Sequence, residues 1–378
     1  MLNQELIINE LKQNPQQSRA DLSKKVHLSK PAVSDIVKEL IEKGIIVETG
    51  VGPSSGGKRP ILLKYNARSN YVIGILIENH TIYLGLGDMY GEIVKLVQRD
   101  FIPPADGEAV IRLIEEGISI LLNSEKVNIQ LVLGAAIGVS GFKLDKEGII
   151  SFSPTINWHN IDLAYELSNK LNIKVVIEND VNLMTIGEFY KGEGKGINDL
   201  SYLFIGDGIG CGFLLNGELY KGFHSASGEI GYMIIGDEKK HEPNLGVFEA
   251  NYGRYGVNRK LKELGINIED KGSFLKILQD QKNNKEVENI LDNIIGQWAK
   301  ATIDIISIID PQVVILSGEL INMDILSFDK YKKTIKKYVP QMPEIRITKL
   351  GSKAGLYGAF HLVLDNFHKP DFEHNKIK

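Results

Sequence analysis

Residues 1–66 combine helical periods of hydrophobic positions with two short strand-like runs. Apolar residues recur every three or four positions in 2–12, in a short segment that begins near Ser18, and in a third segment after Ser29, and each pattern predicts an amphipathic helix. Ser18 and Ser29 suit the capping position of the second and third helices. Apolar runs at 45–48 and 60–63 then flank a Gly- and Ser-rich loop and predict a wing of two strands. This order predicts a winged helix-turn-helix whose third helix enters the DNA major groove.

The remainder of the chain alternates between strand-length apolar runs and helical periods. Three predicted strands are followed by alternating helices and strands, and the scheme then repeats, which predicts two α/β lobes. The strands are expected at 71–77, 81–86, 93–98, 131–137, 175–177, 200–205, 209–215 and 313–317, and the helices at 110–122, 161–171, 181–190, 290–309 and 355–364. We call residues 1–66 the head and residues 67–378 the body.

The segment 200–231 carries the strongest local signals of the body. Gly206-Asp207-Gly208 separates two apolar runs, and Asn216-Gly217 is typical of a tight hairpin turn. Every second residue from 206 to 212 is glycine, which lets backbone approach a ligand closely. A Gly-rich hairpin that binds nothing would show the same pattern, so the glycines alone leave both possibilities open.

The composition of the chain does not change these predictions, but the distribution of charge indicates a kind of partner for the head. The 378-residue chain is 43% hydrophobic and 24% charged, as in ordinary globular proteins. Its single cysteine excludes an internal disulfide framework and a Cys-rich zinc site. Because no apolar run has membrane length and the start lacks a signal-peptide profile, we expect a cytoplasmic protein without a membrane partner. The head holds 10 Lys or Arg against 7 Asp or Glu within a chain of net charge −4, which favours an anionic partner for the head.

Six residues of the head are candidates for contact with DNA. Four belong to the third helix and its cap, on a face away from the apolar stripe, and two are cations at the tip of the wing. They are Ser29, Lys30, Ser34 and Lys38 in the helix, and Lys58 and Arg59 in the wing. An exposed helix face or a solvated loop charge would explain any of them singly, whereas their combination with helix, turn, helix and wing favours DNA binding.

The order of motifs along the chain resembles that of the ROK family. This family joins sugar kinases and sugar-responsive repressors on an actin-like, ribonuclease H-like fold. The resemblance implies a two-lobed α/β body behind a winged helix-turn-helix, with lobe one at about 67–185 plus the C-terminal helix and lobe two at about 186–350. The motifs that carry it are GVSG at 138–141, ENDVN at 178–182, GE at 187–188, GDGIGCG at 206–212, SGEIG at 227–231, and SxGGKRPxxL in the head.

The resemblance also implies a sugar site in the cleft between the lobes. Its hydroxyl-binding residues map to Asn157, Asn179, Asp180, Glu229 and Glu249. Carboxylates and an amide match the donors and acceptors of a polyol. In the kinases, the residue that matches Asp180 is the base that activates the sugar hydroxyl; here we expect it to be vestigial and only to accept a hydrogen bond. The alternatives are a helix cap at Asp180 and a structural carboxylate at Glu229.

The nucleotide side and the zinc side of the family pattern are missing. The first phosphate turn, DxGGT, is replaced by GILIENH at 74–80, and Asp207 stands where the second turn has Thr. A carboxylate a few ångströms from a phosphate is repelled by several kcal/mol, roughly, at an effective dielectric constant near 20. Glu319 replaces a glycine of the adenosine side, Tyr232 replaces the family His, and His241 stands without the cysteines of the zinc segment. We therefore expect no cofactor, no metal and no enzymatic activity.

These features predict a sugar-responsive transcriptional regulator of carbohydrate metabolism, acting as a repressor. It would bind operator DNA through the head, as a homodimer or tetramer, and a sugar effector in the cleft. Two alternatives stay open. One is a sugar kinase with an appended DNA-binding head, and the other is a regulator whose body only dimerises.

Overall fold

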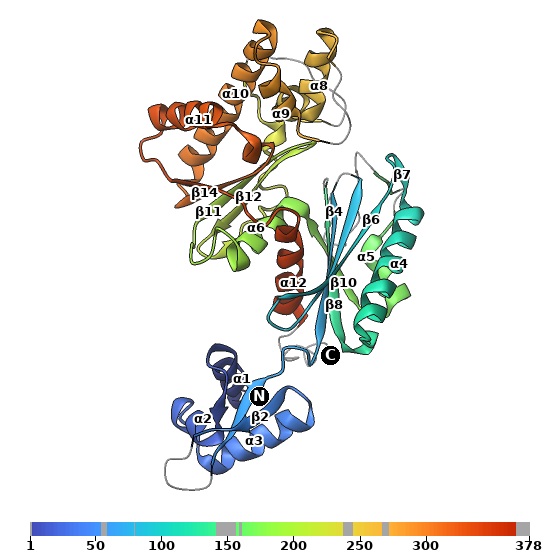
Figure 1. The fold of residues 1–378 in the computed structure, drawn as a ribbon, viewed down its shortest axis with the longest axis vertical. Coiled ribbons are helices and arrows are strands. Elements are labelled where there is room, and N and C mark those ends of the chain that lie inside the picture. Colours follow the sequence, from blue (N-terminus) through green and yellow to red (C-terminus); the bar gives the residue numbers. More distant parts are fainter. Residues whose placement is uncertain are drawn as a thin grey trace.

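The computed structural model describes residues 2–53, 59–78, 80–140, 156–158, 161–236, 245–266 and 272–367. The head lies at one end of the molecule, and the body above it contains two large sheets (Figure 1). The structure thus confirms the mixed α/β fold class expected from the sequence.

The head has the three helices and the wing that its hydrophobic pattern predicts. Ser18 and Asp21 form a reciprocal capping box at the start of α2, and the Ser29 side chain accepts a hydrogen bond from the Ala32 N–H at the start of α3. A two-residue strand that the sequence did not reveal joins the wing, giving the order β1-β3-β2. The elements are α1 (Leu2–Gln13), β1 (Gln17–Ser18), α2 (Arg19–Lys25), α3 (Lys30–Glu42), β2 (Ile46–Val51) and β3 (Ile61–Tyr65).

The first large sheet, which defines lobe one, has the strand order β10-β8-β4-β5-β6. Its central strand β4 is buried on both faces, because α4 and α5 cover one side of the sheet and α12 packs on the other. This explains why β4 reads as a continuous apolar run instead of an alternating one. The elements are β4 (Tyr71–Glu78), β5 (Thr81–Gly87), β6 (Ile93–Asp100), α4 (Gly107–Glu125), η1 (Ile129–Leu131), β8 (Val132–Val139), α5 (Leu163–Leu171) and β10 (Lys174–Asn179), with a small ladder of β7 (Ala105–Asp106) and β9 (Ile156–Asn157).

The second large sheet, which defines lobe two, has the order β13-β12-β11-β14-β15. Asn216 and Gly217 both have positive φ, 54° and 80°, at the predicted hairpin turn between β12 and β13. The sequence interpretation did not include α7, α8, α9, α11 or β15, and α10 begins five residues before the expected start. The elements are β11 (Leu200–Ile205), β12 (Ile209–Leu215), β13 (Glu218–Leu219), η2 (Ile230–Tyr232), α7 (Val247–Tyr252), α8 (Arg254–Glu263), α9 (Phe274–Asp280), α10 (Lys285–Ile309), β14 (Val313–Gly318), η3 (Glu319–Asn322), α11 (Ile325–Tyr338) and β15 (Glu344–Ile347).

Two helices join the lobes. α6 (Asp180–Lys191) packs on β11 and β12, whereas α12 (Lys353–Phe367) packs on β4 and β8, and the pair lies between the two sheets (Figure 1). Their backbones touch where they cross. A Cβ atom added to Gly187 would lie 1.8 Å from the Ala354 carbonyl oxygen, and one added to Gly358 would lie 1.8 Å from that of Leu183. Only glycine allows this crossing.

No helix within the described parts of the chain combines the length and the apolar character that a membrane span requires.

The close crossing can be tested with a matched pair of glycine substitutions in helices. Gly187→Ala is expected to lower the free energy of unfolding by about 1–3 kcal/mol, because backbone atoms of α12 occupy the space of the new methyl group. Gly296→Ala in α10 meets no atom within 4 Å and should leave stability unchanged or raise it by up to about 1 kcal/mol through helix propensity. Urea denaturation measures both. If both substitutions changed the free energy of unfolding equally, the close backbone contact between α6 and α12 would be contradicted.

Candidate functional site

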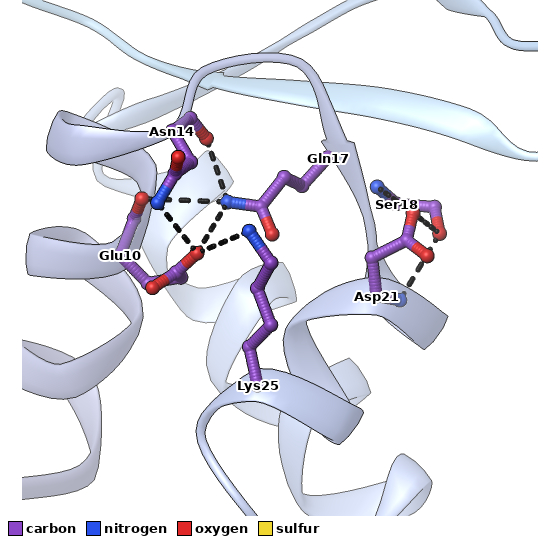
Figure 2. Close-up of polar contacts among 6 residues, drawn as sticks. All are labelled: Glu10, Asn14, Gln17, Ser18, Asp21 and Lys25. Carbon is purple, nitrogen blue, oxygen red and sulfur yellow. Dashed lines mark hydrogen bonds and ion pairs between the residues drawn. The ribbon is translucent and has the colours of Figure 1, made fainter.

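A polar network fixes the first two helices of the head against each other. The Glu10 carboxylate accepts hydrogen bonds from the side chains of Asn14 (3.1 Å), Gln17 (3.0 Å) and Lys25 (2.8 Å), as Figure 2 shows. The bond from Lys25 lowers the pKa of Glu10. The network ties the end of α1 to the end of α2, so α3 is presented from a defined scaffold.

The exposed face of α3 carries the candidate DNA-reading residues. Val33, Val37 and Leu40 point into the head core, while Ser29, Lys30, Ser34 and Lys38 are exposed. None of the described ion pairs includes Lys30 or Lys38, so both cations are available to a phosphate or a base. In the wing, Arg59 is exposed and its Nε donates a hydrogen bond to the Gly52 carbonyl oxygen (3.1 Å). Lys58 lies outside the described residues.

Asn179 and Asp180 lie where β10 ends and α6 begins. The cap of α6 is Asn179, whose Oδ1 accepts a hydrogen bond from the Asn182 N–H (3.1 Å). Asp180 is the first residue of the helix, and its carboxylate accepts from the Val181 N–H (2.9 Å). The capping role considered for Asp180 therefore belongs to its neighbour. The carboxylate of Asp180 is buried and keeps acceptor capacity for a ligand.

Lobe two brings two more carboxylates to the same place. Glu229 precedes η2, and Glu249 lies in α7, where its Oε2 accepts a hydrogen bond from the Ile209 N–H (2.9 Å) at the start of β12. Burial and the charges of Asp180 and Glu249 raise the pKa of Glu229 to about 7. Burial and the charges of Glu78 and Glu249 raise that of Asp180 to about 7. We call Asp180, Glu229 and Glu249 the cleft carboxylates.

The other members of the expected sugar set are placed less centrally. Asn157 is exposed on β9, which pairs with β7 at the edge of lobe one. No hydrogen bond described in the structure joins Asn157 to the cleft carboxylates. Asn179 uses its side-chain oxygen as a cap, so only its amide N–H groups are left for a ligand.

Sequence reasoning missed a cation beside this group. The Lys221 ammonium, from the segment after β13 in lobe two, pairs with the Glu178 carboxylate at the end of β10 in lobe one. Glu178 is buried and also accepts a hydrogen bond from the Asn182 side chain (3.0 Å). The pair therefore bridges the two lobes next to Asp180. No local pattern around Lys221 distinguishes it from an ordinary surface lysine.

A second missed cation, Arg254, occupies the side of the cleft where the family pattern would place a nucleotide. Its guanidinium pairs with Asp207, lies 3.5 Å from the Glu319 carboxylate, and donates a hydrogen bond to the Gly272 carbonyl oxygen (2.7 Å). Asp207 is the carboxylate that was expected to repel phosphate at the second turn, and Glu319 is the residue that replaces a glycine of the adenosine side. Both carboxylates contact the same internal cation, Arg254. Two carboxylates at positions where the family has Thr and Gly were the sequence signal that a cation should lie nearby.

Comparison with known proteins identifies the family of the chain. The model of the ROK family matches residues 72–366, and a winged helix-turn-helix DNA-binding model matches residues 3–47. The chain belongs to the ROK family. It is 30% identical to a xylose repressor of Bacillus spizizenii and 27% identical to one of Caldicellulosiruptor bescii, in each case over 97% of this chain and 96% of the relative. The crystal structure of a ROK family transcriptional regulator, a homologue of the E. coli Mlc protein, superposes with a TM-score of 0.76 over 96% of this chain and 95% of that one, at 19% identity.

These matches include the head, so the chain is a regulator of the ROK family and not one of its enzymes. Within the described residues, no group of three or more His, Cys, Asp or Glu side chains is arranged to hold a metal ion. His241, considered above for zinc, lies outside them.

Asp180, which is buried, and Glu229, which is partly buried, make stability depend on pH. In the unfolded chain, Asp180 and Glu229 lose their protons near pH 4, whereas in the folded protein they hold them up to about pH 7. Between these values the folded state binds more protons, so the free energy of unfolding should fall as pH rises from about 5 to 8, by on the order of a few kcal/mol.

Urea denaturation at each pH unit measures this dependence. Asp180→Asn combined with Glu229→Gln should flatten it, whereas Glu166→Gln, an exposed carboxylate in α5, should not. A wild-type stability that rises steadily over this interval would contradict the assigned burial.

Proposed function

We propose that this ROK protein is a sugar-responsive transcriptional repressor of carbohydrate metabolism. One observation supports it most: carboxylates from both lobes lie together at the proposed sugar site, while Arg254 pairs with Asp207 and Glu319 at the positions where the family pattern would place a nucleotide. A site of this kind has hydrogen-bonding groups for a polyol but lacks the phosphate-binding turns of the family's kinases. We also propose the division into a head of residues 1–66 and a body of residues 67–378, with lobe one at about 67–185 plus the C-terminal helix and lobe two at about 186–350.

The proposed effector is a neutral monosaccharide bound by the cleft carboxylates and by Asn157 and Asn179. Its hydroxyl groups would donate to the carboxylates and accept from the two amides. Phosphorylated sugars fit this site less well, because several carboxylates face the cleft and the described cation there, Lys221, is paired with Glu178. Since two similar proteins are named xylose repressors, D-xylose is the first effector to test.

The proposed DNA partner is a palindromic operator bound by a homodimer or by two heads of a tetramer. Each head would place α3 in a major groove, with half-sites about one helical turn apart. Ser29, Lys30, Ser34 and Lys38 would contact bases and phosphates, and Lys58 and Arg59 would contact the backbone or minor groove. Such a regulator works in the cytoplasm. The rival proposal, a body that only dimerises, differs in one observable: calorimetry would then show no monosaccharide binding.

Substitutions in the wing and in α3 should affect DNA binding differently. Lys58→Ala with Arg59→Ala should weaken binding to all sequences and reduce the slope of log affinity against log salt by roughly one for each lost phosphate contact. Lys30→Ala or Ser34→Ala should instead change sequence preference. Fluorescence anisotropy at several salt concentrations measures the first, and selection from a random DNA pool measures the second.

The matched control is Lys336→Ala with Lys337→Ala, which removes two exposed cations from α11 in lobe two. This variant should keep the wild-type slope. If the wild-type protein selects no sequence at low salt, with or without sugar, the regulator proposal is wrong.

Removal of the cleft carboxylates should abolish the sugar response. Asp180→Ala and Glu229→Ala each delete a carboxyl group and leave a sugar hydroxyl without its partner, which costs about 1–3 kcal/mol each, so sugar affinity should fall by about tenfold. Operator affinity without sugar should change little, because the head is remote from the cleft (Figure 1). Calorimetry with D-xylose, and anisotropy with and without it, provide the measurements. Glu166→Ala in α5 is the control, and wild-type sensitivity in either cleft variant would place the effector elsewhere.

A further inference from the structure

Helix α6 extends from the cleft to the joint between body and head. At its N-terminus lie Asn179, the cap, and Asp180, the first residue. At its other end lies Lys191, the last of its 12 residues. With a rise of 1.5 Å per residue, these ends are about 17 Å apart. The same rigid element therefore holds a proposed sugar contact and a residue at the joint.

Lys191 fastens α6 to the turn between β5 and β6. Its ammonium donates a hydrogen bond to the Tyr90 carbonyl oxygen (3.1 Å) and pairs with the Glu92 carboxylate (2.6 Å). The turn is well defined, because Asp88 Oδ1 accepts hydrogen bonds from the N–H groups of Tyr90 (2.8 Å) and Glu92 (3.0 Å). A displacement of Lys191 is thus passed to residues 88–92 as a unit.

The same turn forms part of the contact between body and head, which also includes Leu133 of β8 and Leu364 of α12. The Tyr90 ring packs edge-on against Tyr65, the last residue of wing strand β3, with centroids 5.4 Å apart and an angle of 80°. Met89 is buried in the head core, and its N–H donates to the Ala67 carbonyl oxygen (2.9 Å). The Lys12 ammonium of α1 lies over the same Tyr65 ring, 4.8 Å from its centroid. The wing therefore packs against the turn through Tyr65, and α1 contacts the same tyrosine.

Helix α12 supports the same end of α6. The Tyr190 ring stacks on His361 of α12, with centroids 3.6 Å apart and an angle of 3°, and its hydroxyl contacts the Asp365 carboxylate (3.1 Å). Gly91 of the turn lies against the same histidine, since an added Cβ would be 2.9 Å from its Nε2. The turn is consequently held by both helices that join the lobes.

We propose that α6 transmits the state of the cleft to the head and that Lys191 is the positioning residue of this coupling. The inference rests on the proposed function, because it needs a sugar that binds at the N-terminus of α6. A sugar that favours one position of α6 would favour one position of the 88–92 turn and hence of the wing. The sugar can shift operator affinity only by its differential affinity for the two positions, typically about 5–150-fold.

The test compares Lys191→Met with wild type in the full-length protein. The measured quantity is the ratio of operator affinities with and without a saturating sugar, using whichever of D-xylose, D-glucose and N-acetyl-D-glucosamine binds most tightly by calorimetry. Lys191→Met should reduce this ratio at least about threefold toward one, while sugar affinity in the absence of DNA stays within about threefold. Glu92→Gln, which keeps the bond to Tyr90, should reduce the ratio less.

Lys170→Met is the matched control, because it removes a lysine that pairs with Glu115 (3.4 Å) elsewhere in lobe one. It should keep the wild-type ratio. A wild-type ratio in Lys191→Met, with sugar bound, overturns the coupling role but leaves the proposed function intact. If none of the three sugars binds to wild type, the proposed function fails instead.

A second measurement needs no sugar. Hydrogen exchange of the amides at 65–70 and 88–92 should be faster in Lys191→Met than in wild type or Lys170→Met. Unchanged exchange at these amides would overturn the mechanical link between α6 and the head.

Discussion

The backbone contact between α6 and α12 is the constraint on which the arrangement of the body depends. Each helix packs on the sheet of a different lobe, so their crossing sets how the two sheets face each other. Gly187 and Gly358 allow a separation that any side chain would prevent. Because α6 begins at the carboxyl end of β10, the crossing also fixes where Asp180 meets Glu229 and Glu249 from the other lobe. The geometry of the cleft therefore depends on two glycines that lie at the helix crossing and not among the cleft carboxylates.

Charge compensation then distinguishes the two sides of the cleft. Asp207 and Glu319 share the Arg254 guanidinium, so its positive charge compensates part of their negative charge within lobe two. The described ion pairs include no partner for Asp180, Glu229 or Glu249, and burial raises the pKa of each of them. Carboxylates that are wholly or partly buried without a cation reduce stability, and a group of them at one place is typical of a binding site. Arg254 thus compensates charge on one side of the cleft, whereas the cleft carboxylates on the other side keep acceptor capacity for a ligand.

The sequence predicted the elements with strong periodicity and missed those whose meaning depends on distant partners. The head helices, β4, β11 and β12 have long apolar stripes or runs with clear breaks, and they appear where expected. Helices α7, α8 and α9 are short or polar, so their burial is decided by tertiary contacts that no local pattern reveals: α7 and α9 pack on α10, and α8 packs on α7 and α9. The same holds for the site. Carboxylates at strand ends were visible in the sequence, whereas Lys221 and Arg254 are defined only by the carboxylates that the fold brings to them.

The ion network around Arg254 also bears on how a sugar could act as a signal. Arg254 joins the β11–β12 turn, the segment before α9 and the start of η3, which makes this side of lobe two one unit. Under the proposed function, the sugar is the ligand whose binding energy distinguishes one lobe position from another. A regulator of this kind would give a two-state response, in which the sugar concentration sets the position of α6.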